Sequence, residues 1–75
     1  MKKLLAILSD LNPDVDFENE DALIDGGILD SFVIVSLVAE IDDVFGVQIP
    51  AEELTAENFN SVQALHALIR RLEDA

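Results

Sequence analysis

Residues 31–45, SFVIVSLVAEIDDVF, constrain the fold more than any other stretch of this 75-residue chain. The apolar residues recur three and four positions apart, the spacing of the core-facing stripe of an amphipathic helix. Gly46 follows, and glycine readily ends a helix in the left-handed conformation. The pattern predicts a helix that begins at Asp30 or Ser31 and ends near Phe45. Its core stripe consists of Ile34, Leu37, Val38, Ile41 and Phe45.

This helix has more apolar residues than one core face requires. Phe32, Val35 and Ala39 form a second stripe on the face that includes Ser31, and Val33 also lies outside the core stripe. Either the loop before the helix covers the second stripe, or the stripe stays partly exposed as a surface for partner proteins. We favour the exposed arrangement, because one helix of so small a domain rarely buries its whole circumference.

Two further helical segments lie at the ends of the chain, and no segment shows a strand pattern. Residues 2–11 carry apolar residues at helical spacing and stop near Pro13, which disfavours helix in the residue before it. The last helix begins at Asn60 or Ser61, and Gln63 follows Asn60 by three residues, close to a capping box. Its apolar face consists of Val62, Leu65, Leu68, Ile69 and Leu72.

The middle of the chain contains a long connection and a short third helix. Residues 12–30 form the connection, and Thr55 is placed to cap a turn that ends at Phe59, after a short turn that follows Pro50. We therefore expect an all-α fold, a small four-helix bundle with a short helix three and a long loop between helices one and two. We expect residues 1–75 to form a single domain. The expected anchors of the loop are Val15, Phe17, Leu23, Ile24 and Leu29.

The charge balance narrows the possible partners. Sixteen acidic and four basic residues give a net charge of −12, which opposes binding to nucleic acid and favours basic partner proteins. The chain has no cysteine, which excludes disulfides and thiolate metal sites. The opening MKKLLAIL is too short for a signal peptide, and no apolar run is long enough to span a membrane. We expect a cytoplasmic monomer that does not insert into membranes.

The residues offer no catalytic or metal site. A nucleophilic serine needs a base, and the only histidine, His66, lies within the last predicted helix. Without its sequence context, Ser31 would therefore be interpreted as an ordinary polar residue at the start of a helix. Residues 14–25 alternate acidic side chains as a calcium loop does, but Asn19 stands where such a loop requires glycine. We therefore expect no enzyme activity and no metal, with the acidic loop solvated.

The stretch LIDGGILDSFVIVSLVAEIDDVFGVQIPAEEL resembles the acyl carrier and peptidyl carrier proteins. Its LDS, residues 29–31, is similar to the family's phosphopantetheine attachment motif Asp-Ser-Leu, with Phe32 in place of the leucine. FGVQIP and NSVQAL also match the family at corresponding places, and the likeness covers essentially the whole chain. GILDSF is closest in appearance to D-alanyl carriers and freestanding peptidyl carriers.

The resemblance implies a function that needs no catalytic group in this chain. A phosphopantetheinyl transferase would move phosphopantetheine from coenzyme A to Ser31, beside the motif residue and helix cap Asp30. The thiol of this group would then hold an acyl or aminoacyl cargo as a thioester. The implied partners are that transferase, an acyl- or aminoacyl-adenylating ligase, and a downstream acyl transferase or synthase.

The sequence departs from the fatty-acid carriers of the family at two positions. Those carriers usually place acidic residues two and five positions after the serine, where this chain has Val33 and Ser36. The resemblance therefore favours loading by an adenylating ligase, in D-alanylation or secondary metabolism, over a fatty-acid carrier. An unmodified acidic interaction module is the further alternative. The expected partner surface consists of Phe32, Val33, Val35, Ser36, Ala39, Glu40 and Asp43.

Overall fold

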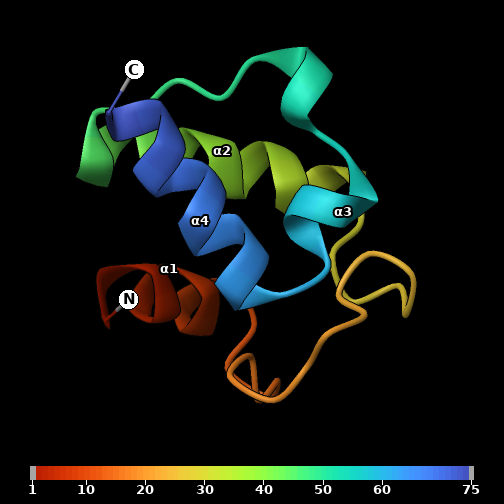
Figure 1. The fold of residues 1–75 in the computed structure, drawn as a ribbon. Helices are drawn as coiled ribbons and strands as arrows, with labels where there is room; N and C mark the ends of the chain where they lie inside the picture. The colour runs from red at the N-terminus through yellow and green to blue at the C-terminus, as the bar shows by residue number, and fades with distance from the viewer. Residues whose placement is uncertain (1, 75) are drawn as a thin grey trace.

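The computed structural model describes residues 2–74 and contains four α-helices in that range. These are α1 (Lys2–Leu11), α2 (Ser31–Phe45), α3 (Ala56–Phe59) and α4 (Val62–Glu73), and a 3-10 turn, η1 (Ala51–Glu53), precedes α3 (Figure 1). No strand occurs among the described residues. The predicted all-α fold is confirmed, including the short third helix and the long loop between the first two helices.

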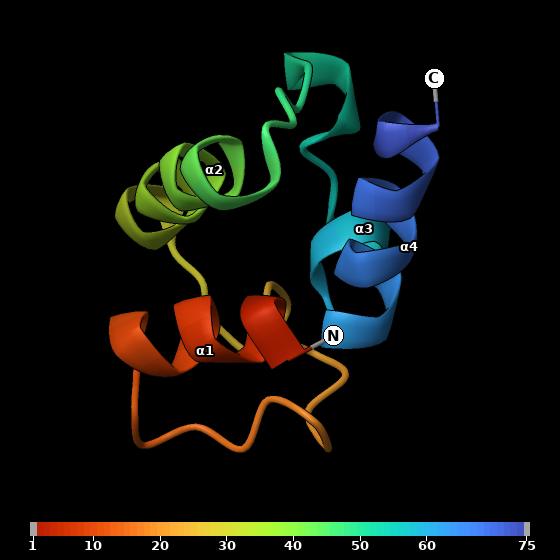
Figure 2. The same cartoon turned by 90° about the vertical axis from the view of Figure 1, so that its left-hand side faces the viewer.

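The three longer helices surround one apolar core. α1 packs against both α2 and α4, and α3 packs against α4. Figure 2 shows α2 and α4 on two different sides of the fold, with α1 below α2 and reaching toward α4. Every buried side chain in the described range is apolar. The core consists of Leu4, Ile7, Leu8, Phe17, Leu23, Leu29, Leu37, Ile41, Val47, Ile49, Phe59, Val62, Leu65, Leu68 and Ile69.

The helix boundaries follow their predicted caps, with one exception. Gly46 ends α2 in the left-handed conformation, with φ of 67°. Ser61 is the N-cap of α4, and its Oγ accepts a hydrogen bond from the Ala64 amide at 3.1 Å. The suggested capping box that involves Gln63 is wrong, because the Gln63 side-chain amide donates instead to the Glu18 carbonyl at 3.1 Å.

The long loop is held to the core by its apolar residues. Phe17, Leu23 and Leu29 are buried, whereas Val15 and Ile24 are half-buried against the core. The connection after α2 contributes as well, through the buried side chains of Val47 and Ile49. Helical apolar spacing did not predict the burial of these two residues, because they lie in a connection outside the helices.

The core stripe of α2 is only partly enclosed. Leu37 and Ile41 are fully buried, whereas Ile34, Val38 and Phe45 are half-buried and pack against the core. The core is therefore concentrated on the middle of α2. No described helix has the length and apolar character needed to cross a membrane.

Candidate functional site

Asp30 and Ser31 have separate roles at the start of α2. The Asp30 side chain is the N-cap, and its Oδ1 accepts a hydrogen bond from the Val33 amide at 2.9 Å. Its backbone carbonyl accepts the first helical hydrogen bond, from the Ile34 amide at 2.9 Å. Ser31 is the first helical residue, is exposed, and is not needed as a cap. The helix therefore presents the serine hydroxyl to solvent at its N-terminal end.

The chain reaches this point through a compact hydrogen-bonded turn. The Leu29 amide donates to the Leu23 carbonyl at 2.8 Å, which closes the segment between them. Within it, Gly27 has φ of +75°, which favours glycine. A Cβ at Gly26 would lie 2.6 Å from the Ala22 carbonyl oxygen, so glycine is required there as well. The two glycines allow the loop to turn just ahead of the serine.

The second stripe of α2 is exposed, and the loop does not cover it. Phe32 is 79% exposed and Val35 is 71% exposed. Ala39, Glu40 and Asp43 are exposed farther along the same helix. Large apolar side chains at such exposure are typical of a surface that binds other proteins. The expected exposed arrangement is confirmed, and the arrangement in which the loop buries the stripe is wrong.

Two residues of the expected partner surface are less exposed than the others. Val33 is half-buried and packs against the core, and Ser36 is half-buried. Val33 therefore contributes to folding as well as to the surface beside Ser31. A variant at this position tests both roles at once, whereas Phe32 and Val35 test the surface alone.

A small apolar hollow lies beside the first turns of α2. It measures about 70 Å³ and is lined by Ile24, Ile34, Leu54, Thr55, Ala56 and Phe59. The lining comes from the long loop, from α2 and from the α3 region, so residues far apart in sequence form it. Sequence periodicity did not predict the hollow, because its walls exist only after these segments pack.

Comparisons with known proteins identify the family. Residues 2–73 match the family described as "Phosphopantetheine attachment site". The chain belongs to the phosphopantetheine-binding carrier proteins. This carrier is 33% identical over 60 residues to the D-alanyl carrier protein of Streptococcus uberis, covering 80% of this chain and 75% of that relative. It is 35% identical, over the same length and coverage, to the D-alanyl carrier protein of Streptococcus equi subsp. zooepidemicus.

Membership of the family settles the class of function. The prosthetic group of this carrier is covalently attached phosphopantetheine. Carriers of this type hold groups for partner enzymes and are not catalysts themselves. The exposed serine hydroxyl at the start of α2 fits the group, because a phosphate there would face the positive end of the helix dipole.

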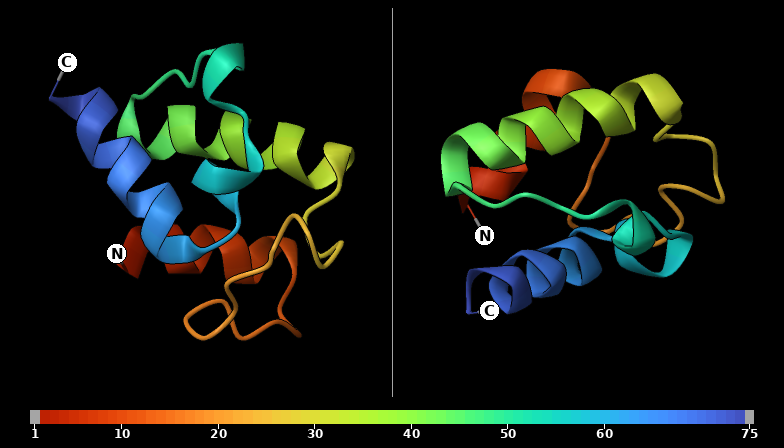
Figure 3. Two further views of the ribbon diagram at one scale, coloured as in Figure 1. Left: turned by 45° about the vertical axis from the view of Figure 1, so that its right-hand side comes forward. Right: turned by 90° about the horizontal axis from the view of Figure 1, so that it is seen from above.

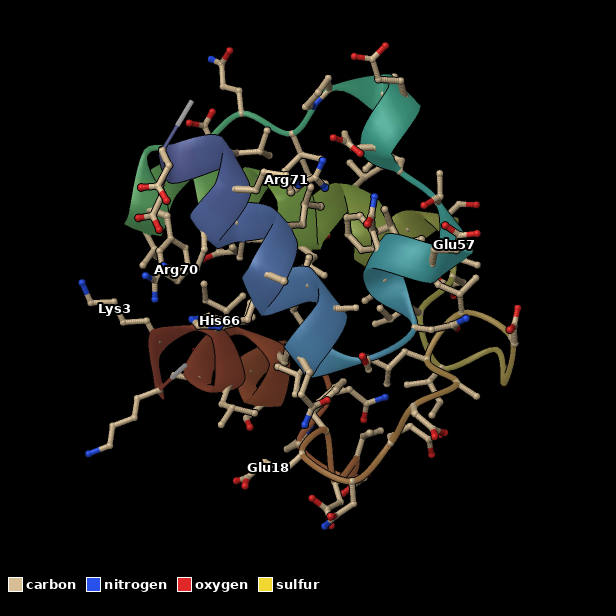
Figure 4. All side chains as sticks on the ribbon, viewed as in Figure 1. Lys3, Glu18, Glu57, His66, Arg70 and Arg71 are labelled. Atoms are coloured by element: carbon tan, nitrogen blue, oxygen red, sulfur yellow. The ribbon has the colours of Figure 1, made fainter. Side chains whose placement is uncertain are left out.

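Two basic residues of the carrier, Lys3 and Arg70, lie away from the start of α2. Figure 4 shows Lys3 and Arg70 at the edge where α1 begins and α4 ends, and Figure 3 shows both chain termini at the end opposite the N-terminal end of α2. Arg71 forms an ion pair with Glu53 at 2.9 Å. Acidic residues therefore dominate the charge around the exposed stripe.

The remaining candidates in the carrier lack the features of a reaction centre. His66 is half-buried in α4 where that helix passes α1 (Figure 4), rather than beside the start of α2. Among residues 2–74, no three histidine, cysteine or acidic side chains are close enough together to hold a metal ion. The acidic loop, which includes Glu18, lies along the outside of the fold (Figure 4).

Proposed function

We propose that Ser31 is the attachment residue and that an adenylating ligase loads the carrier with an amino acid or another small acid. The observation that supports the attachment site is the division of roles at the start of α2. Asp30 satisfies the helix cap through the Val33 amide, and Ser31 is left exposed with its hydroxyl available to a partner enzyme. No base is needed in this chain, because the transferase supplies it.

The proposed attachment reaction uses the exposed Ser31 hydroxyl. The Ser31 oxygen attacks the phosphorus atom next to the pantetheine half of coenzyme A, and its proton passes to a base of the transferase. The bond from that phosphorus to the adenosine bisphosphate half breaks, which leaves a phosphodiester on the serine. The phosphate would lie at the N-terminal end of α2, where backbone amides and the helix dipole favour negative charge. The thiol of the attached group supplies the thioester chemistry.

The preference for a small cargo rests on three observations. The relatives at 33% and 35% identity are D-alanyl carrier proteins. Val33 and Ser36 stand where the fatty-acid carriers have acidic residues. The hollow beside α2 is about 70 Å³, far smaller than the roughly 300–1,000 Å³ of typical small-molecule pockets, and would not enclose a long acyl chain without widening.

The partners follow from the same proposal. A phosphopantetheinyl transferase, the ligase and a downstream acyl transferase or synthase bind the start of α2 in turn, in the cytoplasm, with the carrier as a monomer. Phe32, Val33, Val35, Ser36 and Ala39 supply the contact surface, and acidic residues at its edge steer basic partners toward it. Those acidic residues are Glu40 and Asp43.

A loading experiment tests the proposed cargo class. The phosphopantetheinylated protein is incubated with ATP and, in separate reactions, with a D-alanine-adenylating ligase and with a ligase for long-chain fatty acids. We expect a hydroxylamine-sensitive thioester from the first reaction and none from the second. Efficient loading with the fatty acid alone would favour the fatty-acid carrier. An unmodified protein that no transferase accepts would favour the interaction module.

Replacing Val35 with aspartate is expected to lower the loading kcat/KM by about tenfold or more. When the new carboxylate enters an apolar contact surface, it loses its water and gains no hydrogen-bonding or charged partner. A tenfold loss of kcat/KM corresponds to about 1.4 kcal/mol. Because Val35 is 71% exposed, thermal stability should change little. Val33→Asp should lower both loading and stability, since Val33 packs against the core.

The matched control is Val44→Asp, at the other end of the same helix. Val44 is also exposed, at 40%, but lies about three and a half helical turns from Ser31. We expect this variant to load at nearly the normal rate. Equal losses for Val35→Asp and Val44→Asp would contradict a docking surface centred on the start of α2, and unchanged loading in both Val33→Asp and Val35→Asp would refute it.

A further inference from the structure

Asn60, at the junction of α3 and α4, makes an unusual number of contacts with the distant long loop. Its backbone carbonyl accepts a hydrogen bond from the Leu23 amide at 2.8 Å. Its side-chain Oδ1 accepts from the amides of Ile24 at 2.9 Å and Asp25 at 3.1 Å. Its Nδ2 donates to Oδ2 of Asp25 at 3.0 Å. One residue thus satisfies three successive loop amides and one loop carboxylate.

These contacts connect to Ser31 through a short path. The Asn60 side chain holds the Ile24 and Asp25 amides, and both residues lie inside the turn that the Leu29 amide closes by donating to the Leu23 carbonyl at 2.8 Å. Leu29 is buried, and Asp30 follows it as the cap of α2. Two residues of chain reach at most about 7 Å, so fixing Leu29 fixes where Ser31 can lie. The α3–α4 junction is therefore tied to the start of α2.

We propose that Asn60 is a positioning residue for phosphopantetheine attachment, an inference that rests on the proposed role of Ser31 as acceptor. Asn60 holds residues 23–29 in the arrangement that presents the first turn of α2 to the transferase. Without its side chain, the Ile24 and Asp25 amides lose their acceptor, and the start of α2 is held by fewer contacts.

The kinetic consequence follows from the population of the competent arrangement. The apparent affinity of a partner falls in proportion to the fraction of molecules whose binding surface is already ordered. Once the transferase has bound, the loop is ordered again and the chemical step is unchanged. Loss of the Asn60 side chain should therefore raise KM for the carrier and leave kcat nearly constant.

A neighbouring contact provides the matched control. Gln63, in the first turn of α4, also bonds the long loop, through the Glu18 carbonyl at 3.1 Å. Glu18 lies twelve residues before Asp30 in the sequence and does not take part in the turn that closes at Leu29. Removing the Gln63 side chain loosens the loop far from Ser31. A general need for loop anchoring would affect both variants, whereas positioning of Ser31 would affect only Asn60.

The test measures kcat and KM for phosphopantetheine transfer to four proteins. These are the unchanged protein, Asn60→Ala, Gln63→Ala and the double variant Asn60→Asp with Asp25→Asn. The double variant reverses the amide–carboxylate pair, so the new carboxylate can accept the loop amides and the new amide can donate to it. Amide hydrogen exchange at Ile24, Asp25 and Leu29 is recorded on the same samples.

We expect Asn60→Ala to raise KM about tenfold with kcat within about twofold, and to speed exchange at the three amides. Gln63→Ala should leave KM within about twofold, and the double variant should recover most of the loss. An Asn60→Ala variant with unchanged KM, or one matched by Gln63→Ala, would overturn the inference. If Asn60→Ala does not fold, Asn60→Gln, which displaces the amide by one methylene group, is measured in its place and should show the same rise in KM.

The two proposals fail in different ways. An unchanged protein that is modified on a residue other than Ser31, or not at all, refutes the attachment site and the inference with it. An unchanged protein that is modified on Ser31, together with normal KM in every Asn60 variant, refutes only the positioning role.

Discussion

Replacing Phe59 with alanine is expected to remove about 3–5 kcal/mol from the free energy of unfolding. The Phe59 side chain is 1% exposed and packs where α3 meets α4, so its loss leaves a large cavity in the core. A domain of this length has a total stability of about 4–11 kcal/mol, so the variant should lose at least about a quarter of its stability. Urea denaturation followed by circular dichroism measures the change.

Phe32→Ala is the matched control, because the same atoms are removed from a side chain that is 79% exposed. Its unfolding free energy should stay within about 0.5 kcal/mol of the unchanged protein. Its loading kcat/KM should nevertheless fall, since the proposed docking surface loses its largest apolar group. Similar losses of stability in the two phenylalanine variants would contradict the assignment of Phe59 to the core and Phe32 to the surface.

The fold of this chain could be predicted because most of its signals are local. The apolar spacing of residues 31–45, the cap at Asp30 and the glycine at Gly46 all act within a few residues of each other. In the structure, each of these features has the role that the neighbouring sequence predicts for it. The excess of apolar residues on α2 also predicted an exposed stripe, since Phe32 and Val35 have no place in the core.

The contacts of the α3–α4 junction could not be predicted in the same way. The sequence pattern predicts that Asn60 and Gln63 are parts of a helix cap. In the structure, the side-chain amides of both residues form hydrogen bonds with the long loop. Their partners are 35 to 45 residues away in the sequence, so no local pattern reveals them. The burial of Val33 has a similar cause, because it depends on how α2 lies against the rest of the core.

Substitution of Ser31 with alanine is expected to abolish attachment of phosphopantetheine. The hydroxyl oxygen is the atom that forms the new phosphodiester, and alanine has no substitute for it. The cap of α2 is provided by Asp30, so the helix and the stability of the domain should be nearly unchanged. Ser9→Ala is the control, because it removes a hydroxyl from an exposed position of α1, outside the proposed contact surface, and should be modified normally.

The central claim is tested most directly by the intact mass of the protein after incubation with coenzyme A, magnesium and a phosphopantetheinyl transferase of broad specificity. We expect the unchanged protein and Ser9→Ala to gain the mass of a single phosphopantetheine, and Ser31→Ala to gain none while keeping its helical circular dichroism spectrum. A Ser31→Ala protein that still gains this mass, or an unchanged protein that gains none, would contradict the assignment of Ser31 as the attachment residue of this carrier.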